Sequence, residues 1–400
     1  MILGQISYLD CVVFLISLIP QLLYNVPFFD LISTGFRALP FLCLQLPYQY
    51  ITERYLTPKA QRSPYVRQAT YFQDLVIRIV RYAFAHIDAS VGRVFFSKAV
   101  ALPFVRFRMW RHGYKEFPMP VQEIQLDSEK SAKDVKGIWI NHDTTVDTDK
   151  PDLVVYYCHG GGFSMGSNWF YLEFLIAWVH LLKASYRRPA IFALDYDLVP
   201  DSVWPKQTEQ VHSGYEQVLS VVGDSSRICV AGDSAGGTLI LSLLLGLAKN
   251  ATGTDTQTPG VAALISPWCT IFTSLHRNTP SDFLNSNTLH QYGCQYAGSR
   301  QCLDHPLVSP GNCDDPSWWA RASPSNGFCI FYGSEEVLGP DIKSMVARLR
   351  EAKVAVSVSE EPGSIHAWPV VALFLGQTQE ERQKGLKALV QTIKRSIEPE

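Results

Sequence analysis

The stretch RICVAGDSAGGTLILSLLLGL, residues 227–247, decides how the rest of the chain is interpreted. The largely apolar run Arg227–Ala231 predicts a buried strand, and Ala235–Leu247 predicts a helix just after it. Between them, Ser234 stands in the pentapeptide GDSAG with small residues on both sides. A serine on a tight strand-to-helix turn needs such neighbours because the backbone is crowded there, and the helix start points free N–H groups at its hydroxyl. Ser234 is therefore the candidate nucleophile, the alternative being an ordinary glycine-rich turn.

A second glycine motif, HGGG at residues 159–162, follows the predicted strand Leu153–Tyr157. Three glycines let the backbone approach a ligand closely and aim several N–H groups at one point. Donors arranged in this way stabilise the negative charge that develops during acyl transfer. A phosphate-binding loop is the alternative, and it is disfavoured because no Lys-Ser/Thr follows and the GxGxxG spacing is absent.

On both sides of these motifs, from about residue 120 onward, short β-branched or aromatic runs alternate with helical stretches. This alternation is typical of a mostly parallel α/β sheet. Further strands are predicted at Val121–Leu126, Lys136–Ile140, Ala190–Leu194, Val261–Ile265, Phe328–Tyr332 and Val354–Ser359, and further helices at Tyr171–Lys183, Lys206–Val221, Asp341–Ala352 and Gln379–Ser396. Only the turn-rich residues 127–134 separate the first two strands, which predicts an antiparallel pair at one edge of the sheet.

Composition narrows the class of function. The 400 residues carry 35 Lys and Arg against 37 Asp and Glu, so the net charge of −2 offers no basic field for phosphates, and nucleic acid is not an expected partner. The 21 Phe, 18 Tyr and 9 Trp favour an apolar ligand or a lipid-facing surface. The nine cysteines form no CxxC pair, which excludes zinc ribbons and thioredoxin-like sites. They are either free thiols or include one bridge among Cys294, Cys302 and Cys313.

The N-terminal 50 residues are unusually apolar and contain only three charged side chains, those of Asp10, Asp30 and Arg37. No basic residue precedes Arg37, so the segment lacks the positive start of a secretory signal. The apolar run Tyr8–Tyr24 is interrupted too often for a clean spanning helix of ~20 residues. Two interpretations stay open: an anchor in or on a membrane, such as that of the endoplasmic reticulum, or helices that cover an apolar pocket of a cytoplasmic protein.

The motifs together resemble those of the hormone-sensitive-lipase-like branch of the α/β hydrolases. The matching stretches are HGGGF at 159–163, LDYDLVP at 194–200, GDSAGG at 232–237 and ISPW at 265–268. Asp197 departs from the family pattern, which has Arg at this position. The resemblance covers roughly residues 120–395 and is strongest to fungal steryl acetyl hydrolases and esterases of secondary-metabolite gene clusters. It implies an α/β-hydrolase fold, with an eight-stranded, mostly parallel sheet and a helical cap.

The apolar N-terminus, the breaks in the strand–helix alternation and the extent of the resemblance together predict a division of the chain into three regions. Residues 1–50 would be the apolar N-terminal segment, 51–118 a helical cap region, and 119–400 the catalytic domain with a cap insertion at about 270–325. Both cap regions interrupt the strand–helix alternation, and we expect them at the end of the sheet where the strands finish. In open α/β sheets that end binds the ligand.

The family order of catalytic residues is serine, then acid, then histidine. The family's acid precedes Pro-Leu, and aligning this pattern on Leu338 places the acid at Glu336, with Glu in place of Asp. Glu335 and Asp341 are the competitors. His366 is the only histidine after Glu336 and is followed closely by an aromatic residue, as in the family.

The expected reaction is hydrolysis of a carboxylic ester. His366 would deprotonate Ser234, Glu336 would orient the imidazole, and backbone N–H groups of Gly160, Gly161 and Ala235 would bind the oxyanion. No metal or organic cofactor is implied. The expected partner is a small hydrophobic substrate, an acetyl or short-acyl ester of an alcohol such as a sterol or a polyketide-type metabolite. The alternatives are an acyltransferase or cyclase that uses the same serine, or a catalytically silent ligand-binding protein.

Overall fold

A computed structural model describes residues 2–126, 135–144, 150–250 and 257–397. Its centre is an eight-stranded sheet with the strand order β1-β2-β4-β3-β5-β6-β7-β8. The strands are β1 (Val121–Leu126), β2 (Val135–Ile140), β3 (Leu153–Cys158), β4 (Pro189–Leu194), β5 (Ile228–Asp233), β6 (Val261–Ile265), β7 (Phe328–Gly333) and β8 (Val356–Glu361). β2 runs antiparallel to both β1 and β4, and every other pair is parallel. The predicted fold class is confirmed, including the antiparallel edge; the turn predicted at 127–134 lies outside the described residues.

Six of the eight strands differ from the prediction by one or two residues, and the differences of two residues fall at β5 and β8. β5 continues to Asp233 because that residue still pairs with Ile265 of β6. β8 begins at Val356, two residues later than predicted, because the N–H of Val354 bonds to Leu349 and closes the preceding helix. Val354 is buried although it precedes the strand, so its burial made the apolar pattern look longer than the strand itself.

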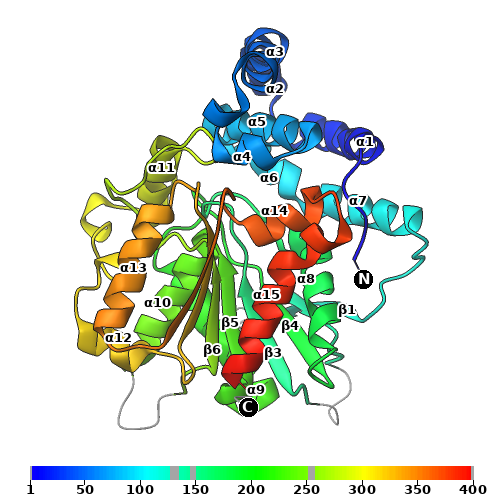
Figure 1. The fold of residues 1–400 in the computed structure, drawn as a ribbon. Helices are drawn as coiled ribbons and strands as arrows, with labels where there is room; N and C mark the ends of the chain where they lie inside the picture. The colour runs from blue at the N-terminus through cyan, green and yellow to red at the C-terminus, as the bar shows by residue number, and fades with distance from the viewer. Residues whose placement is uncertain (1, 127–134, 145–149, 251–256, 398–400) are drawn as a thin grey trace.

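Helices cover both faces of the sheet (Figure 1). One face carries α9 (Lys206–Val222), α10 (Ala235–Asn250), α12 (Pro316–Ala322) and α13 (Gly339–Glu351), and the other carries α8 (Asn168–Leu182), α14 (Trp368–Leu375) and α15 (Gln379–Ile397). Every residue of β3 is buried, and its side chains alternate between two separate cores: Tyr156 lies in one and Tyr157 in the other. This two-sided burial explains why the central strands are almost continuously apolar.

The N-terminal helices form a cap over the end of the sheet where the parallel strands finish (Figure 1). They are α1 (Tyr8–Asn25), α2 (Phe28–Pro40), α3 (Leu46–Ile51), α4 (Pro64–Gln68), α5 (Tyr71–His86), α6 (Ala89–Phe96) and α7 (Lys98–Arg111), joined by α11 (Ser286–Ala297) from the segment after β6. α1 is the only helix among the described residues that is long and apolar enough to cross a membrane.

A buried ion-pair cluster fixes α1 to the rest of the molecule. Asp10 is fully buried, and its Oδ2 lies 3.2 Å from Arg108 and 2.6 Å from Arg111 of α7. Arg108 also contacts Glu173 of α8 at 2.9 Å. Because a charge without a partner is costly to bury, Asp10 holds one face of α1 against the protein. The same face buries Phe14 and Leu18 in a small core with α6 and α7.

All nine cysteines lie within the described residues, and none of them forms a disulfide. Cys294, Cys302 and Cys313 are therefore free, which agrees with the free-thiol interpretation rather than with a bridge among them.

Candidate active site

Ser234 sits on the turn between β5 and α10, with the positive φ of 53° that this sharp reversal requires. A Cβ at Gly236 would lie 2.0 Å from the carbonyl oxygen of Cys158, and one at Gly232 would lie 2.5 Å from the backbone of Gly236. Both positions therefore need glycine. The N–H of Ser234 donates to the carbonyl of Ile265 at 3.0 Å, so the turn is also held to the neighbouring strand.

The HGGG loop lies beside this turn because β3 pairs directly with β5. Gly160 N–H donates to Asp233 Oδ1 at 2.8 Å, so the sequence-based assignment of this N–H to the oxyanion needs correction: the donor is already occupied. Within the described parts of the chain, the N–H groups of Gly161, Gly162 and Ala235 form no hydrogen bond. Gly161 has φ +116°, and a Cβ there would lie 2.1 Å from the Met165 carbonyl oxygen, so this backbone path also requires glycine.

Asp233, the residue before the serine, holds the glycine loop in place. Besides Gly160, its carboxylate accepts hydrogen bonds from the hydroxyls of Tyr157 at 2.5 Å and Tyr171 at 2.7 Å. Complete burial raises the pKa of Asp233, while the two hydroxyls act in the opposite direction. This role of Asp233 was not predicted from the sequence, although its position next to Ser234 was the available signal.

A cap arginine supports the same loop from the other side. Arg93 of α6 donates its Nε to the carbonyl of Ser164 at 3.0 Å and a second nitrogen to the carbonyl of Val199. Val199 in turn donates its N–H to Phe163 at 3.0 Å. The cap therefore contributes directly to the conformation of the glycine loop.

Glu336 and His366 follow the neighbouring strands β7 and β8, which brings their loops together. The Nδ1 of His366 lies 3.2 Å from Oε2 of Glu336, and both side chains are buried. Glu335 interacts instead with Ser281 at 3.3 Å, and Asp341 accepts two hydrogen bonds from Thr270. Of the three candidate acids, Glu336 is the one that reaches the histidine.

Burial sets the protonation tendencies of this pair. It raises the pKa of Glu336 and lowers the pKa of His366, because each charged form loses hydration. Two further carboxylates, those of Asp282 and Asp233, oppose the shift at His366. A histidine whose pKa is held down is neutral at physiological pH and can accept a proton.

The histidine loop is tied to the segment that borders the serine turn. Ala367 donates its N–H to the Ser266 hydroxyl at 2.9 Å, and Ser266 directly follows the strand residue that binds Ser234. Positive φ angles occur at Ser234, Ser266, Ala367 and also Phe163, which places several rare backbone conformations in these loops. In the part of the chain that the structure describes, no hydrogen bond joins Ser234 to His366; such bonds commonly tighten only when substrate binds.

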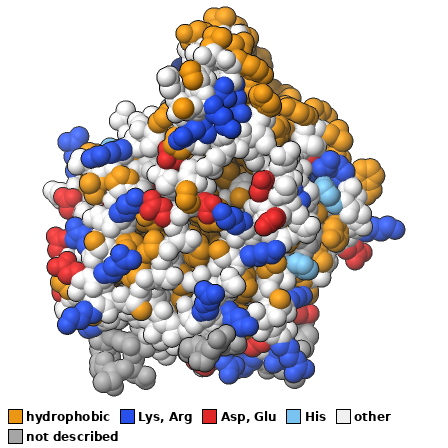
Figure 2. All heavy atoms as spheres, viewed as in Figure 1, with side chains coloured by type: hydrophobic (Ala, Val, Ile, Leu, Met, Phe, Trp, Pro, Cys, Tyr) orange, Lys and Arg blue, Asp and Glu red, His pale blue; other side chains and the backbone are white. Residues whose placement is uncertain are grey.

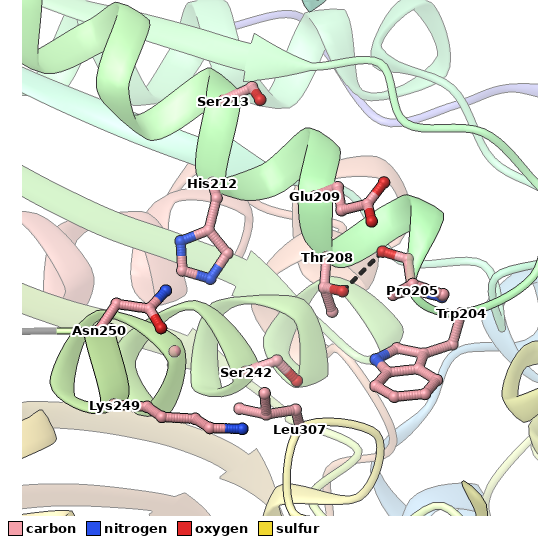
Figure 3. Close-up of a pocket in the computed structure, with 11 residues that line it drawn as sticks. Trp204, Pro205, Thr208, Glu209, His212, Ser213, Ser242, Lys249, Asn250 and Leu307 are labelled. Atoms are coloured by element: carbon pink, nitrogen blue, oxygen red, sulfur yellow. Dashed lines mark hydrogen bonds between the residues drawn. The ribbon is translucent and has the colours of Figure 1, made fainter. Parts of the chain in front are cut away.

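Two surface cavities lie away from these residues. One of about 390 Å³ lies between α9 and α10 and is lined by Trp204, Thr208, His212 and Ser242 among others (Figure 3). The other, of about 510 Å³, includes Asp152, which precedes β3 at the opposite end of the sheet. Ser234 itself is only 5% exposed beneath the cap. Neither cavity contains a residue of the candidate active site.

The chain resembles known proteins in family, in sequence and in structure. Residues 155–370 match the family described as alpha/beta hydrolase fold. The chain is 26% identical over 269 residues to a Schizosaccharomyces pombe protein named "Putative steryl acetyl hydrolase", covering 64% of this chain and 69% of that protein. It is 28% identical over 216 residues to an acetyl-hydrolase of Streptomyces hygroscopicus, covering 53% of this chain and 67% of the relative.

A carboxylesterase of Mycobacterium tuberculosis is 28% identical over 255 residues, covering 60% of this chain and 74% of the relative. Among solved structures, an esterase of the bacterial hormone-sensitive lipase family aligns with a TM-score of 0.61 at 21% identity, covering 82% of this chain and 99% of that one. This structural likeness concerns the fold. With the family match extending over more than half of the chain, the protein belongs to the α/β-hydrolase fold family, in its hormone-sensitive-lipase-like branch of carboxylic ester hydrolases.

Proposed function

We propose that Ser234, His366 and Glu336 form the catalytic triad of an esterase that cleaves acetyl or short-acyl esters of hydrophobic alcohols. The observation that carries the proposal is the buried contact of 3.2 Å between His366 Nδ1 and Glu336 Oε2. It lies at the end of the sheet where Ser234 occupies the strained turn before α10. In this family order of residues, the carboxylate orients the imidazole and the imidazole activates the serine.

The reaction proceeds in two acyl-transfer steps. His366 accepts the proton of Ser234 through Nε2 as the serine oxygen attacks the ester carbonyl, while Nδ1–H donates to Glu336 and stabilises the imidazolium. The oxyanion accepts hydrogen bonds from the backbone N–H groups of Gly161, Gly162 and Ala235. His366 then gives its proton to the departing alcohol. A water molecule, deprotonated by the same histidine, attacks the acyl-serine, and the acid is released with Ser234 regenerated.

The cap and the named relatives support a substrate with an apolar alcohol and a small acyl group. Aromatic side chains lie next to the proposed catalytic residues. The rings of Phe283 and His366 pack edge to face, with their centroids 5.7 Å apart. Tyr292, which a Cβ at Gly162 would contact, packs in the same way against Phe84 at 5.8 Å. These rings suit an apolar alcohol, such as a sterol or a polyketide-type metabolite. Two relatives are named for acetyl hydrolysis, which favours a small acyl group.

Hydrolysis is separated from its alternatives by following both products. The full-length protein is incubated with p-nitrophenyl acetate, and p-nitrophenol and acetate are measured with and without an added hydrophobic alcohol. A hydrolase releases both products in equal amounts under both conditions. Transfer of acetate to the alcohol, with little free acid, identifies an acyltransferase. Absence of turnover identifies a binding protein that has lost the chemistry.

We also propose that the cap rests on a membrane surface. Apolar side chains that are more than half exposed occur along α1, along α2 and in the continuous helical stretch of residues 41–56 that contains α3: Leu9, Val12, Ile16, Ile19, Leu23, Tyr24, Phe28, Phe29, Phe36, Leu44, Tyr48 and Leu56. Figure 2 shows hydrophobic side chains gathered over the top of the molecule, where α2 and α3 lie. A contiguous apolar surface of this extent is typical of a binding face.

The charge of the cap suits an anionic lipid surface. Residues 1–118 contain 13 Lys and Arg and 6 Asp and Glu, a net charge of +7 in a chain whose total is −2. Because Asp10 holds one face of α1 on the protein, the helix lies along the cap, and its opposite face is the one available to lipid. Basic and apolar residues together favour binding in the plane of the interface.

Flotation with vesicles of phosphatidylcholine and phosphatidylserine tests this second proposal. The full-length protein is expected to float, and Phe29→Glu combined with Leu44→Glu is expected to release it. Val203→Glu, at an exposed apolar position outside the cap, is the matched control and should leave flotation unchanged. Flotation of the double variant at the wild-type level contradicts the proposal.

A further inference from the structure

A third carboxylate near His366, that of Asp282, binds both loops of the acid–histidine pair. It lies in the segment between β6 and α11 and is fully buried. Its Oδ2 accepts the N–H of Val337 at 2.8 Å, and its Oδ1 accepts the N–H of His366 at 3.2 Å. Val337 is the neighbour of Glu336, so one carboxylate holds the backbone at both members of the pair.

The position of Asp282 is itself fixed by its own loop. Oδ1 also accepts the N–H of Phe283 at 2.8 Å, and the N–H of Asp282 donates to the Thr279 hydroxyl at 3.0 Å. That hydroxyl donates to the carbonyl of Glu335 at 2.6 Å, which adds a second link to the acid loop. A carboxylate can accept these bonds at once because both of its oxygens are acceptors; an amide offers only one.

The cap reaches the same residue through Arg81 of α5. Its Nε donates to the carbonyl of Asp282 at 2.7 Å, and a second nitrogen donates to the carbonyl of Pro280 at 2.6 Å. The segment that carries Asp282 is therefore held between the cap on one side and the two catalytic loops on the other.

We infer that Asp282 is a positioning residue, which keeps the Glu336 and His366 loops in register and places a second negative charge beside the imidazolium, and that Arg81 holds it in place from the cap. The inference rests on the proposed roles of His366 and Glu336. Three carboxylates face the histidine: Glu336 from the acid loop, Asp282 from the segment after β6, and Asp233 from the end of β5.

The charge has a consequence for the pH profile. Burial lowers the pKa of His366, and Asp282 is the strongest opposing influence on it. Removing that charge should lower the pKa of His366 further, so the acidic limb of activity should move to lower pH. A residue that only fills space would leave this limb in place.

The test compares Asp282→Asn with Asp341→Asn in the full-length protein. Asp341 is the matched control because it is a buried carboxylate with two hydrogen bonds from Thr270 and makes none to either catalytic loop. The readouts are kcat and KM for p-nitrophenyl acetate and the pH dependence of Ser234 modification by a fluorophosphonate. For Asp282→Asn we expect kcat to fall about tenfold with little change in KM. The acidic limb should move down by about 0.5–1 pH unit. Asp341→Asn should lower thermal stability without moving the limb.

The inference is overturned if Asp282→Asn keeps the wild-type kcat. It is also overturned if this variant loses activity while the acidic limb of its pH profile stays at the wild-type position. If Asp282→Asn does not fold, Arg81→Gln is compared with Arg62→Gln, a cap arginine that donates to the carbonyl of Thr57 instead. Arg81→Gln should then reduce kcat several-fold while Arg62→Gln does not, and equal kcat values overturn the inference. Failure of the wild-type protein to react with the fluorophosphonate would count against the proposed triad rather than against Asp282.

Discussion

Gly160 donates its backbone N–H to Oδ1 of Asp233 at 2.8 Å, which joins the glycine loop to the residue that precedes the proposed nucleophile, Ser234. The two residues are 73 positions apart in the chain and meet because β3 and β5 are neighbours in the sheet. This bond removes Gly160 from the candidate oxyanion donors, so Gly161, Gly162 and Ala235 are the donors that we propose. It also makes the geometry of the oxyanion site depend on one buried carboxylate.

Asp233→Asn should therefore reduce both stability and turnover. The amide keeps one acceptor where the carboxylate serves Gly160, Tyr157 and Tyr171, so at least one buried donor is left without a partner. We expect a loss of about 1–3 kcal/mol in the free energy of unfolding and a clear fall in kcat. Tyr171→Phe removes a single bond at the other oxygen and should affect kcat less. Denaturant unfolding and steady-state kinetics measure the two effects, and equal kcat values for the two variants would contradict the assignment.

Gly161→Ala should slow the chemical step more than it weakens substrate binding. The position has φ +116°, and the added methyl would meet the Met165 carbonyl oxygen, so the N–H donor must turn away from the oxyanion. Loss of one such donor costs about 3 kcal/mol of transition-state stabilisation. Gly113→Ala is the control, because Gly113 also has a positive φ but open space around it. A raised KM with unchanged kcat would make the loop a simple binding surface.

Glu336→Gln should lower turnover strongly without changing the fold, because an amide stabilises the imidazolium of His366 less well than a carboxylate does. Glu335→Gln should change little, since this half-buried neighbour contacts Ser281 rather than the histidine. Parallel measurements of kcat and circular dichroism decide the matter. If Glu335→Gln lowers kcat strongly and Glu336→Gln does not, the catalytic acid is Glu335 rather than Glu336.

Asp10→Asn should destabilise the protein by about 3 kcal/mol, because the fully buried Arg108 is left with Glu173 as its one carboxylate partner and the partly exposed Arg111 loses its ion pair. Asp30→Asn, at an exposed position in the first turn of α2, should have little effect. Thermal unfolding measures both variants. Equal melting temperatures for Asp10→Asn and Asp30→Asn would contradict a stabilising role for the Asp10–Arg108–Arg111 cluster. Removal of residues 1–50 would take away Asp10 as well, so point substitutions are the better probe of membrane binding.

The central fold was predictable because strands that are buried on both faces consist of short, continuous apolar runs in the sequence. The two glycine motifs follow directly after such runs, which located the ends of two strands. The occupied N–H of Gly160 was not predictable, since it depends on a contact between distant strands. Asp282 lies in a polar segment without periodicity, where nothing in the local sequence distinguishes a buried carboxylate from an exposed one. Asp10 interrupts an apolar run, and only the position of α7 reveals that its charge is neutralised in the interior.

Covalent labelling of the nucleophile tests the central claim most directly. The full-length protein, Ser234→Ala and Ser242→Ala are treated with a fluorophosphonate, and the modified peptide is identified by mass spectrometry alongside p-nitrophenyl acetate turnover. Ser242 is the matched control, a buried serine in α10, the helix that directly follows Ser234. We predict modification of the peptide containing Ser234 in the wild-type protein and in Ser242→Ala. Ser234→Ala should show no labelling and a loss of several orders of magnitude in turnover. Labelling at another residue, or turnover by Ser234→Ala above about a tenth of the wild-type rate, would contradict the assignment of Ser234 as the nucleophile.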